Sequence, residues 1–294
     1  MDFRILGSLE VLDEGREVAL GGAKQRALLA VLLLHANETL STDRLIEELW
    51  GARPPATAAK TVQVHVSRLR KALDSAGDLI ETRERGYRLA LDPERLDSQR
   101  FERLVGEARN ELAERRPEQA AAALEAALSL WRGEPLADLA YEPFAQPEIV
   151  RLEDLRVAAL ELLIEAKLEL GGHAEVVPQL EVLIGEYPFR ERLRAQLMLA
   201  LYRSDRQADA LQAYQDARRK LVEELGIEPG ERLRDLERGI LAQDPALALP
   251  VLAVVEQPAE QPPAPAPAAQ VDTTGARRLV SIVFADLVGS TGLG

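Results

Sequence analysis

The sequence predicts a mainly α-helical protein in which a small α+β domain, residues 1–92, precedes an all-α domain, residues 93–247. Short β-prone runs cluster in the first domain, where they flank apolar stretches with helical spacing. After Asp92-Pro93 the composition changes to Ala, Leu, Glu and Arg with long helical periodicity. The chain of 294 residues is long enough for two or three domains, each with its own core.

Short strands and a buried helix are expected at the start of the first domain. The runs 3–6, 9–12 and 17–20 are β-prone and are separated by turn-forming residues. They predict a small antiparallel sheet. Residues 22–36 predict a helix that is buried on most of its surface, because residues 27–34 are almost all apolar.

A shorter helix is expected after Ser41, whose hydroxyl is a candidate N-cap, and its end is expected at Gly51, just before a Pro-Pro pair. Thr57 is expected to cap the helix that follows. The apolar side of the shorter helix would consist of Leu45, Ile46, Leu49 and Trp50.

Residues 58–73, AAKTVQVHVSRLRKAL, predict an amphipathic helix that lies in a DNA groove. No acidic residue occurs between Lys60 and Lys71, so the polar side of this helix suits a polyanion. Cations hold phosphates, Arg can pair with guanine, and an exposed methyl group can contact thymine. The alternative is an ordinary surface helix whose basic residues are merely solvated. The packed side would be a stripe of apolar residues: Val62, Val66, Leu69 and Leu73.

A basic hairpin is expected after this helix, with strands at residues 79–82 and 87–90 and a turn at residues 83–86. Arg83, Arg85 and Arg88 lie at or beside its tip. Helix, turn, basic helix and basic hairpin is the order of a winged helix-turn-helix, in which the second helix enters the major groove.

The run VHVSRLRKAL followed by RGYRL resembles the winged-helix effector domain of bacterial response regulators. The arrangement of LWG, two prolines and VSRLR is similar, more narrowly, to the antibiotic regulatory proteins of actinomycetes. By this resemblance Thr61, Val64 and Arg68 are expected near bases. The wing would reach the minor groove through Arg83 and Arg85. The residues expected to hold phosphates are Lys60, His65, Ser67, Arg70 and Lys71.

The net charge of −13 would argue against DNA binding if it were evenly distributed. Residues 1–92, however, hold 13 Lys and Arg against 14 Asp and Glu, and residues 53–88 hold eight against four. Screening confines charge effects to about 10 Å at moderate salt, so the local field matters more than the total.

The second domain shows a repeat with the spacing of tetratricopeptide helix pairs. Ala174-Glu175-Val176 and Ala208-Asp209-Ala210 lie 34 residues apart, with Leu180 and Tyr214 at equivalent places. Such a stack is either a docking surface for another protein or a spacer. Residues from about 96 to 244, ending in ELGIEPGERLRDLERGIL, resemble the bacterial transcriptional activation domain. This resemblance implies contact with RNA polymerase and a homodimer on double-stranded promoter DNA.

Residues 248–276 are rich in Pro and Ala and predict an extended linker. In residues 277–294 the string VSIVFADLVGST is similar to the first strand of class III adenylate and guanylate cyclases, in which Asp286 would be a metal ligand. The metal chemistry of that family needs further residues that have no counterpart here. We therefore expect residues 277–294 to be the truncated first strand of a cyclase-like domain without activity.

The composition excludes several other classes of protein. The chain has no cysteine, its three histidines are far apart, and no stretch approaches the roughly 20 apolar residues of a membrane span. We expect no cofactor, no metal site, no catalytic residue, no membrane contact and a cytoplasmic location. The prediction is a sequence-specific transcriptional activator of secondary metabolism, including antibiotic biosynthesis. The alternatives are the regulatory part of a nucleotide cyclase and a tetratricopeptide adaptor whose winged helix binds protein.

Overall fold

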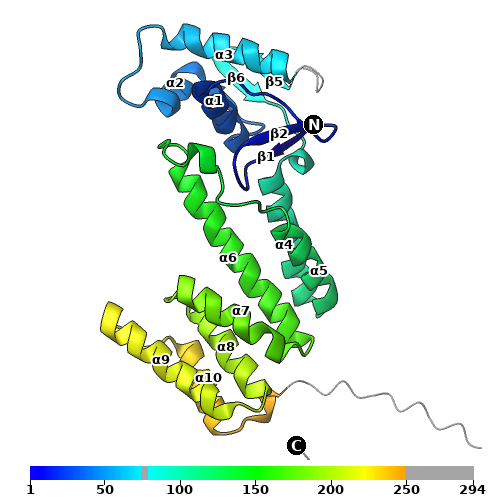
Figure 1. Cartoon of the computed structure of the whole chain (residues 1–294), viewed down its shortest axis with the longest axis vertical. Helices are drawn as coiled ribbons and strands as arrows, with labels where there is room; N and C mark the ends of the chain where they lie inside the picture. The colour runs from blue at the N-terminus through cyan, green and yellow to red at the C-terminus, as the bar shows by residue number, and fades with distance from the viewer. Residues whose placement is uncertain (74–78, 249–294) are drawn as a thin grey trace, which may run out of the picture. The chain divides into compact units, whose positions relative to one another are not determined.

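The computed structural model describes residues 1–73 and 79–248. The predicted cyclase-like segment and nearly all of the predicted linker lie outside the described residues. Ten α-helices and six short strands make up the described part, which confirms a mainly helical fold with an N-terminal winged helix-turn-helix (Figure 1). None of the described helices combines the length and the apolar character that crossing a bilayer requires.

The first sheet is antiparallel, as predicted, but its strands are shorter than the sequence indicates. It consists of β1 (Asp2–Arg4), β2 (Glu10–Asp13) and β3 (Arg16–Glu17), in the order β1-β2-β3. The predicted first strand continued to Leu6. Ile5 and Leu6 instead leave the sheet, because a side chain from the second domain takes their backbone N–H groups.

That side chain is Asp97, which is 5% exposed. Its Oδ1 accepts a hydrogen bond from the Ile5 N–H at 2.8 Å, and its Oδ2 accepts one from the Leu6 N–H at 3.0 Å. Burial raises the pKa of Asp97, whereas these hydrogen bonds and the charge of Arg132 lower it. The predicted strand at residues 17–20 ends at Glu17.

Three helices form the helix-turn-helix: α1 (Ala23–Leu34), α2 (Thr42–Trp50) and α3 (Ala58–Ala72). The Ser41 hydroxyl accepts a hydrogen bond from the Arg44 N–H at 3.1 Å, which confirms the predicted cap of α2. Gly51 ends α2 with φ 57°, a conformation that suits glycine. Thr57 lies at the predicted N-cap position of α3, but its side chain makes no cap hydrogen bond.

The wing is a three-stranded antiparallel sheet, in the order β4 (Thr39–Ser41), β6 (Gly86–Leu89), β5 (Ile80–Arg83). Strand β4 was not predicted. This strand explains why residue 86 is a glycine: a Cβ at this position would lie 1.8 Å from the Leu40 carbonyl oxygen. Glycine at this position allows β4 to approach β6, which a turn requirement alone does not explain.

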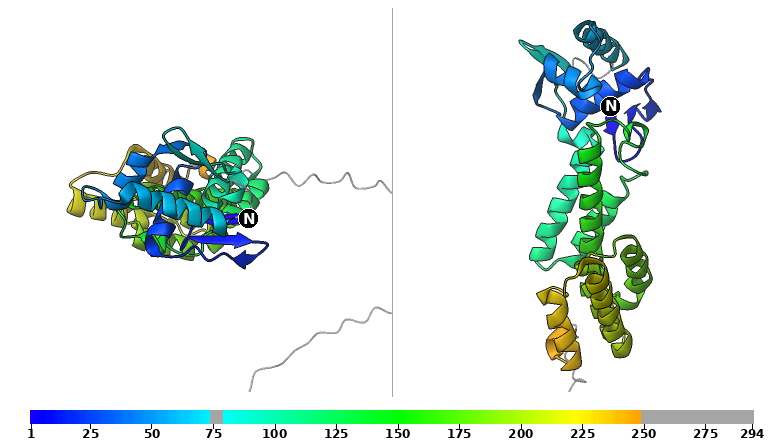
Figure 2. Two further views of the ribbon diagram at one scale, coloured as in Figure 1. Left: turned by 90° about the horizontal axis from the view of Figure 1, so that it is seen from above. Right: turned by 90° about the vertical axis from the view of Figure 1, so that its left-hand side faces the viewer.

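Seven helices form the second domain. α4 (Asp97–Ala113), α5 (Pro117–Leu128) and α6 (Gln146–Glu169) pack on one another, and Figure 2 shows them side by side. The remaining helices are α7 (His173–Glu186), α8 (Glu191–Arg203), α9 (Gln207–Leu225) and α10 (Glu231–Leu241). The 34-residue spacing holds in α7 and α9, because each of its apolar pairs is buried: Val176 with Ala210, Leu180 with Tyr214, and Leu183 with Ala217.

The apolar cores do not follow the two expected domains. One buried cluster runs from Phe3 through α1–α3 and continues into α4, α5 and part of α6. A second cluster starts with Ile164 in α6 and includes the core of α7–α10. Helix α6 therefore contributes to both clusters, and the winged helix shares its core with the first three helices of the second domain.

Ion pairs from α1 to the loop before α6 strengthen this junction. Arg26 Nε lies 2.9 Å from Asp138 Oδ2, and Asp138 Oδ1 accepts a hydrogen bond from the Leu9 N–H at 2.7 Å. Lys24 Nζ lies 3.1 Å from Glu142 Oε2 and donates to the Leu49 carbonyl at 2.9 Å. The second bond satisfies a carbonyl near the C-terminal end of α2.

Candidate nucleic-acid interface

Helix α3 buries one side and exposes the other. Val62, Val66 and Leu69 are at most 1% exposed, whereas Val64 is 40% exposed. Because Val64 and Arg68 lie on the outer side, the orientation of the helix is the one that DNA contact requires. The other exposed members of the predicted set are Lys60, Ser67 and Lys71, and the half-buried ones are Thr61, His65 and Arg70.

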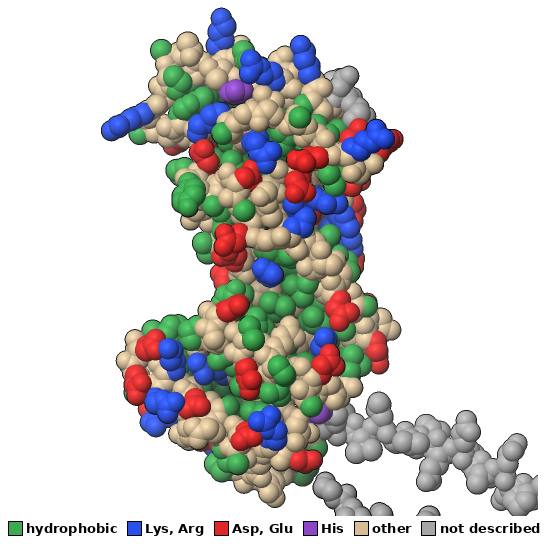
Figure 3. Space-filling view, viewed as in Figure 1, with side chains coloured by type: hydrophobic (Ala, Val, Ile, Leu, Met, Phe, Trp, Pro, Cys, Tyr) green, Lys and Arg blue, Asp and Glu red, His purple; other side chains and the backbone are tan. Residues whose placement is uncertain are grey.

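Three cations on this outer side have no ion-pair partner among the described residues. Lys60, Arg68 and Lys71 form no ion pair with any residue of the described ranges 1–73 and 79–248. Lys and Arg side chains project from the surface over α3 in Figure 3. Unpaired cations on one helix side are the charge arrangement that attracts a phosphate backbone.

The hydroxyl of Thr61 already donates its proton in a hydrogen bond within the protein. Its Oγ1 donates to the carbonyl of Thr57, the residue just before α3, at 2.9 Å. The hydroxyl can therefore only accept a hydrogen bond from a base. An amino group of adenine or cytosine in the major groove is such a donor.

His65 lies between the exposed and buried sides of α3. Burial lowers its pKa, and the nearby charge of Arg68 lowers it further. The imidazole is therefore neutral at pH 7 in the free protein. Its Nδ1 is buried and has no hydrogen-bond partner among the residues that the structure describes.

Arg70 points to the wing. Its Nε and Nη2 donate to the Ile80 carbonyl at 2.9 and 2.6 Å, and Nη2 also donates to Thr82 Oγ1 at 2.8 Å. These bonds tie α3 to β5. They leave Nη1 as the nitrogen without a partner in the described structure, so a phosphate contact by Arg70 stays a prediction.

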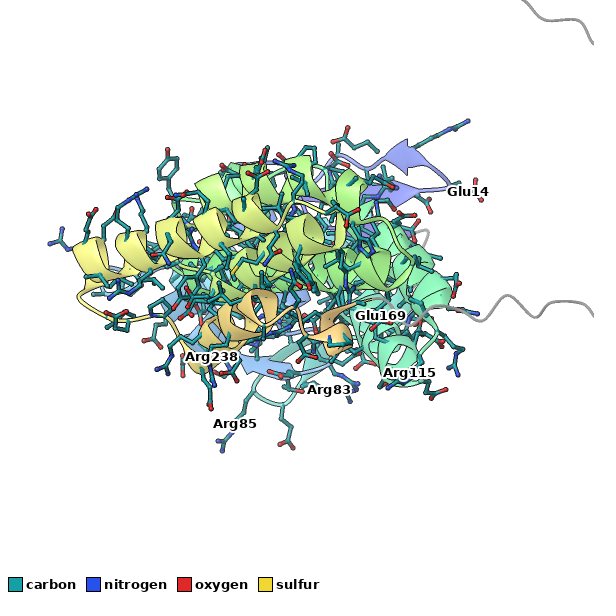
Figure 4. The ribbon with its side chains drawn as sticks, turned by 90° about the horizontal axis from the view of Figure 1, so that it is seen from below. Glu14, Arg83, Arg85, Arg115, Glu169 and Arg238 are labelled. Atoms are coloured by element: carbon teal, nitrogen blue, oxygen red, sulfur yellow. The ribbon has the colours of Figure 1, made fainter. Side chains whose placement is uncertain are left out.

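The two arginines predicted for the wing differ in their surroundings. Arg83 forms an ion pair with Glu81 on the same strand. Arg85 extends from the tip of the hairpin into solvent in Figure 4 and has no ion pair among the described residues. The Arg85 carbonyl accepts from the Thr42 N–H at 3.0 Å, which fixes the tip to the start of α2. Of the two, Arg85 is the free cation.

Asn37 holds the base of the wing and was missed in the sequence. Its Nδ2 donates to the Leu91 carbonyl at 2.7 Å, and its Oδ1 accepts from the Leu91 N–H at 3.0 Å. Its carbonyl accepts from Arg88 Nε at 3.0 Å. The backbone φ of 70° is one that Asn tolerates better than most residues, so an Asn after a long apolar helix was the available signal.

Two family patterns match consecutive parts of the chain. Residues 15–89 match the family described as "Transcriptional regulatory protein, C terminal", and residues 96–241 match the "Bacterial transcriptional activator domain". The first match covers α1–α3 and the wing, and the second covers α4–α10.

Several whole proteins are similar to the chain. The transcriptional regulator RedD of Streptomyces coelicolor is 38% identical over 85% of this chain and 73% of RedD. The regulatory protein DnrI of Streptomyces peucetius is 36% identical over 84% of this chain and 94% of DnrI. The regulatory protein AfsR of Streptomyces coelicolor is 42% identical over 93% of this chain, but the chain spans only 27% of AfsR.

A solved structure, Mycobacterium tuberculosis EmbR in complex with a low-affinity phosphopeptide, shares the fold with a TM-score of 0.81 and 39% identity. The match covers 83% of this chain and 65% of EmbR. The likeness extends over both domains and nearly the full length of DnrI, with the winged helix and the activator domain in the same order. The chain therefore belongs to the actinomycete antibiotic regulatory protein family, the family of transcriptional regulators that includes RedD and DnrI.

Proposed function

We propose that this chain is a sequence-specific DNA-binding activator of transcription that controls secondary metabolism in the cytoplasm. The observation that carries the proposal is the outer side of α3, where exposed cations that have no ion-pair partner within residues 1–73 and 79–248 surround an exposed Val64. Helix α3 enters the major groove and the wing contacts the neighbouring minor groove. The family membership supports this function.

The residues of α3 divide into base readers and phosphate contacts. Arg68 pairs with a guanine, Val64 contacts a thymine methyl group, and Thr61 accepts from an amino group. Lys60, Ser67 and Lys71 hold phosphates, and His65 is a further phosphate contact. Arg85 is the main contact of the wing with the minor groove, because Arg83 already forms an ion pair with Glu81.

The helical domain transmits DNA binding to RNA polymerase. The ion pairs of Arg26 with Asp138 and of Lys24 with Glu142, together with the shared core, fix α1 to this domain. Because the helical domain is fixed to the winged helix, DNA binding would hold the helical domain at a defined position beside the promoter. On DNA the protein acts as a homodimer.

The chain acts without catalysing a reaction. This part of the proposal rests on relatives that are named as regulators. The string at residues 280–291 resembles the first strand of class III cyclases, and we assign it no reaction. An adaptor that binds protein through its winged helix would cover the outer side of α3 with its own acidic helices, whereas that side is exposed here.

Selection from a pool of random DNA duplexes tests the function. We expect enrichment of one motif, repeated at a spacing that reports a dimer. Recovery of the input pool without an enriched motif would exclude sequence-specific binding.

A salt titration of the same complex tests the phosphate contacts. Lys71→Ala should weaken binding to all duplexes and lower the salt slope by about one. Lys220→Ala is the matched control, because Lys220 lies on α9 and is ion-paired with Glu224. Equal slopes for Lys71→Ala and wild type would contradict the assignment of α3.

A further inference from the structure

A second group of cations surrounds a cavity away from α3. The cavity has a volume of about 250 Å³ and lies between β1, the turn Pro93–Arg95 and the ends of α4 and α5 that face them. Four arginines line it against two aspartates. The charged lining consists of Arg4, Arg95, Arg100, Arg132, Asp2 and Asp97.

Two of the carboxylates near these arginines, Asp97 and Glu10, already have partners. Asp97 accepts the N–H groups of Ile5 and Leu6. Glu10 lies opposite Arg4 in the sheet, but its Oε1 is 2.7 Å from Arg132 Nη1. Arg132 is therefore the arginine of the cavity that has structural partners.

The charges of the other three arginines are not paired with a carboxylate in the described part of the chain. The guanidinium groups of Arg4, Arg95 and Arg100 make no hydrogen bond and no ion pair with any residue in the described part of the chain. Asp2 also lies at the cavity, but it is not within ion-pair distance of these groups. Three like charges around one concave site repel one another, and an anion between them would remove that cost.

The size and the donors of the cavity define the class of ligand. Guanidinium groups match phosphate oxygens with paired N–H donors, which makes arginine the usual phosphate-binding residue. The volume is below the roughly 300–1,000 Å³ of pockets that enclose a whole drug-sized molecule. The cavity therefore suits one phosphate or diphosphate group, with the rest of the ligand in solvent.

We propose that this cavity binds the phosphate or diphosphate group of a small anionic ligand. The site is separate from the proposed DNA interface, because none of the residues that line the cavity lies in α3 or in the hairpin β5–β6. A bound ligand would link β1 to α4, next to the hydrogen bonds that Asp97 makes with Ile5 and Leu6. It therefore stabilises the junction between the N-terminal sheet and the helical domain.

Calorimetric titration of the full chain with inorganic pyrophosphate tests this proposal, with thermal unfolding as a second readout. We expect saturable binding and a higher unfolding temperature with the ligand. The double variant Arg4→Ala/Arg100→Ala should bind pyrophosphate at least about tenfold more weakly, a loss of about 1.4 kcal/mol. Arg100→Lys keeps the charge without the paired donors and should give an intermediate loss.

Arg109→Ala is the matched control, because Arg109 is an exposed arginine of α4 that does not line the cavity. It should bind pyrophosphate as wild type does. The double variant is tested for folding by circular dichroism. If it does not fold, Arg100→Lys alone decides, and wild-type affinity in that variant contradicts the proposal.

Two further measurements separate this site from α3. Lys71→Ala should bind pyrophosphate normally, and the double variant should bind duplex DNA normally. Absence of saturable binding to the wild type would overturn the proposal. So would undiminished binding in the folded double variant, or a loss of DNA affinity in that variant without a loss of pyrophosphate affinity. The pyrophosphate outcomes do not depend on whether the chain reads a DNA sequence.

Discussion

Helices α3 and α9 are both amphipathic, exposed on one side and rich in Lys and Arg, yet their charges behave differently. In α9, Arg219 lies 2.7 Å from Asp216, Arg218 lies 2.6 Å from Glu228, and Lys220 pairs with Glu224. The outer cations of α3 have no such partners in the described structure. Whether an acidic side chain lies within ion-pair distance of each cation, rather than the number of cations, decides whether a helix presents charge to a partner. For this reason a chain with a net charge of −13 can carry a DNA interface.

The largest effect is expected for an α3 arginine without an ion pair. Arg68→Ala should cost about 1–3 kcal/mol of binding free energy at a cognate site and relax the preference for one base. Arg219→Ala in α9 is the control and should leave DNA affinity unchanged. Gel-shift assays with cognate and scrambled duplexes measure both. If the two variants lost the same affinity, the contrast between the helices would be wrong.

A smaller effect is expected for the arginine that ties α3 to the wing. Arg70→Ala removes charge-assisted hydrogen bonds to Ile80 and Thr82 and should lower the free energy of opening β5 and β6 by about 1–2 kcal/mol. Hydrogen exchange of the hairpin amides measures this opening. Arg70→Lys cannot bond both acceptors with one fork and should not restore protection. Unchanged exchange in both variants would show that the wing does not need Arg70.

The smallest effect concerns pH. A phosphate next to His65 raises its pKa in the complex above the lowered pKa of the free protein, so binding takes up a proton. DNA affinity of the wild type should therefore increase about two- to threefold as the pH falls from about 8 to about 6. His65→Gln should lack this increase, as fluorescence anisotropy at each pH would show. The same increase in His65→Gln would assign the proton to another group.

Local patterns in the sequence predicted the helices and the orientation of α3 well. The stripe from Val62 to Leu73 is buried as its spacing indicates, and Ser41 caps α2. Strand β4 could not be predicted, because it has three residues, a single apolar side chain and a partner strand more than 40 positions away. Pairing at that distance leaves no periodicity to read.

The function of individual arginines was harder to predict for the same reason. Sequence spacing places Arg70 on the polar flank of α3, but it does not show that the Ile80 carbonyl comes within reach. Nor does it show that Glu81 pairs with Arg83 while Arg85 remains free. The cavity at Arg4 and Arg100 is likewise invisible in sequence, because its walls come from segments about 90 residues apart.

Helix α6 has a consequence for how such regulators evolve. Residues of α6 belong to both apolar clusters. A chain that ended after the winged helix would therefore expose Phe3, Leu6 and their neighbours to water, because their packing partners would be missing. Recombination that swaps DNA specificity between relatives should therefore exchange the winged helix together with α4–α10, or change only side chains on α3 and leave the inherited interior intact.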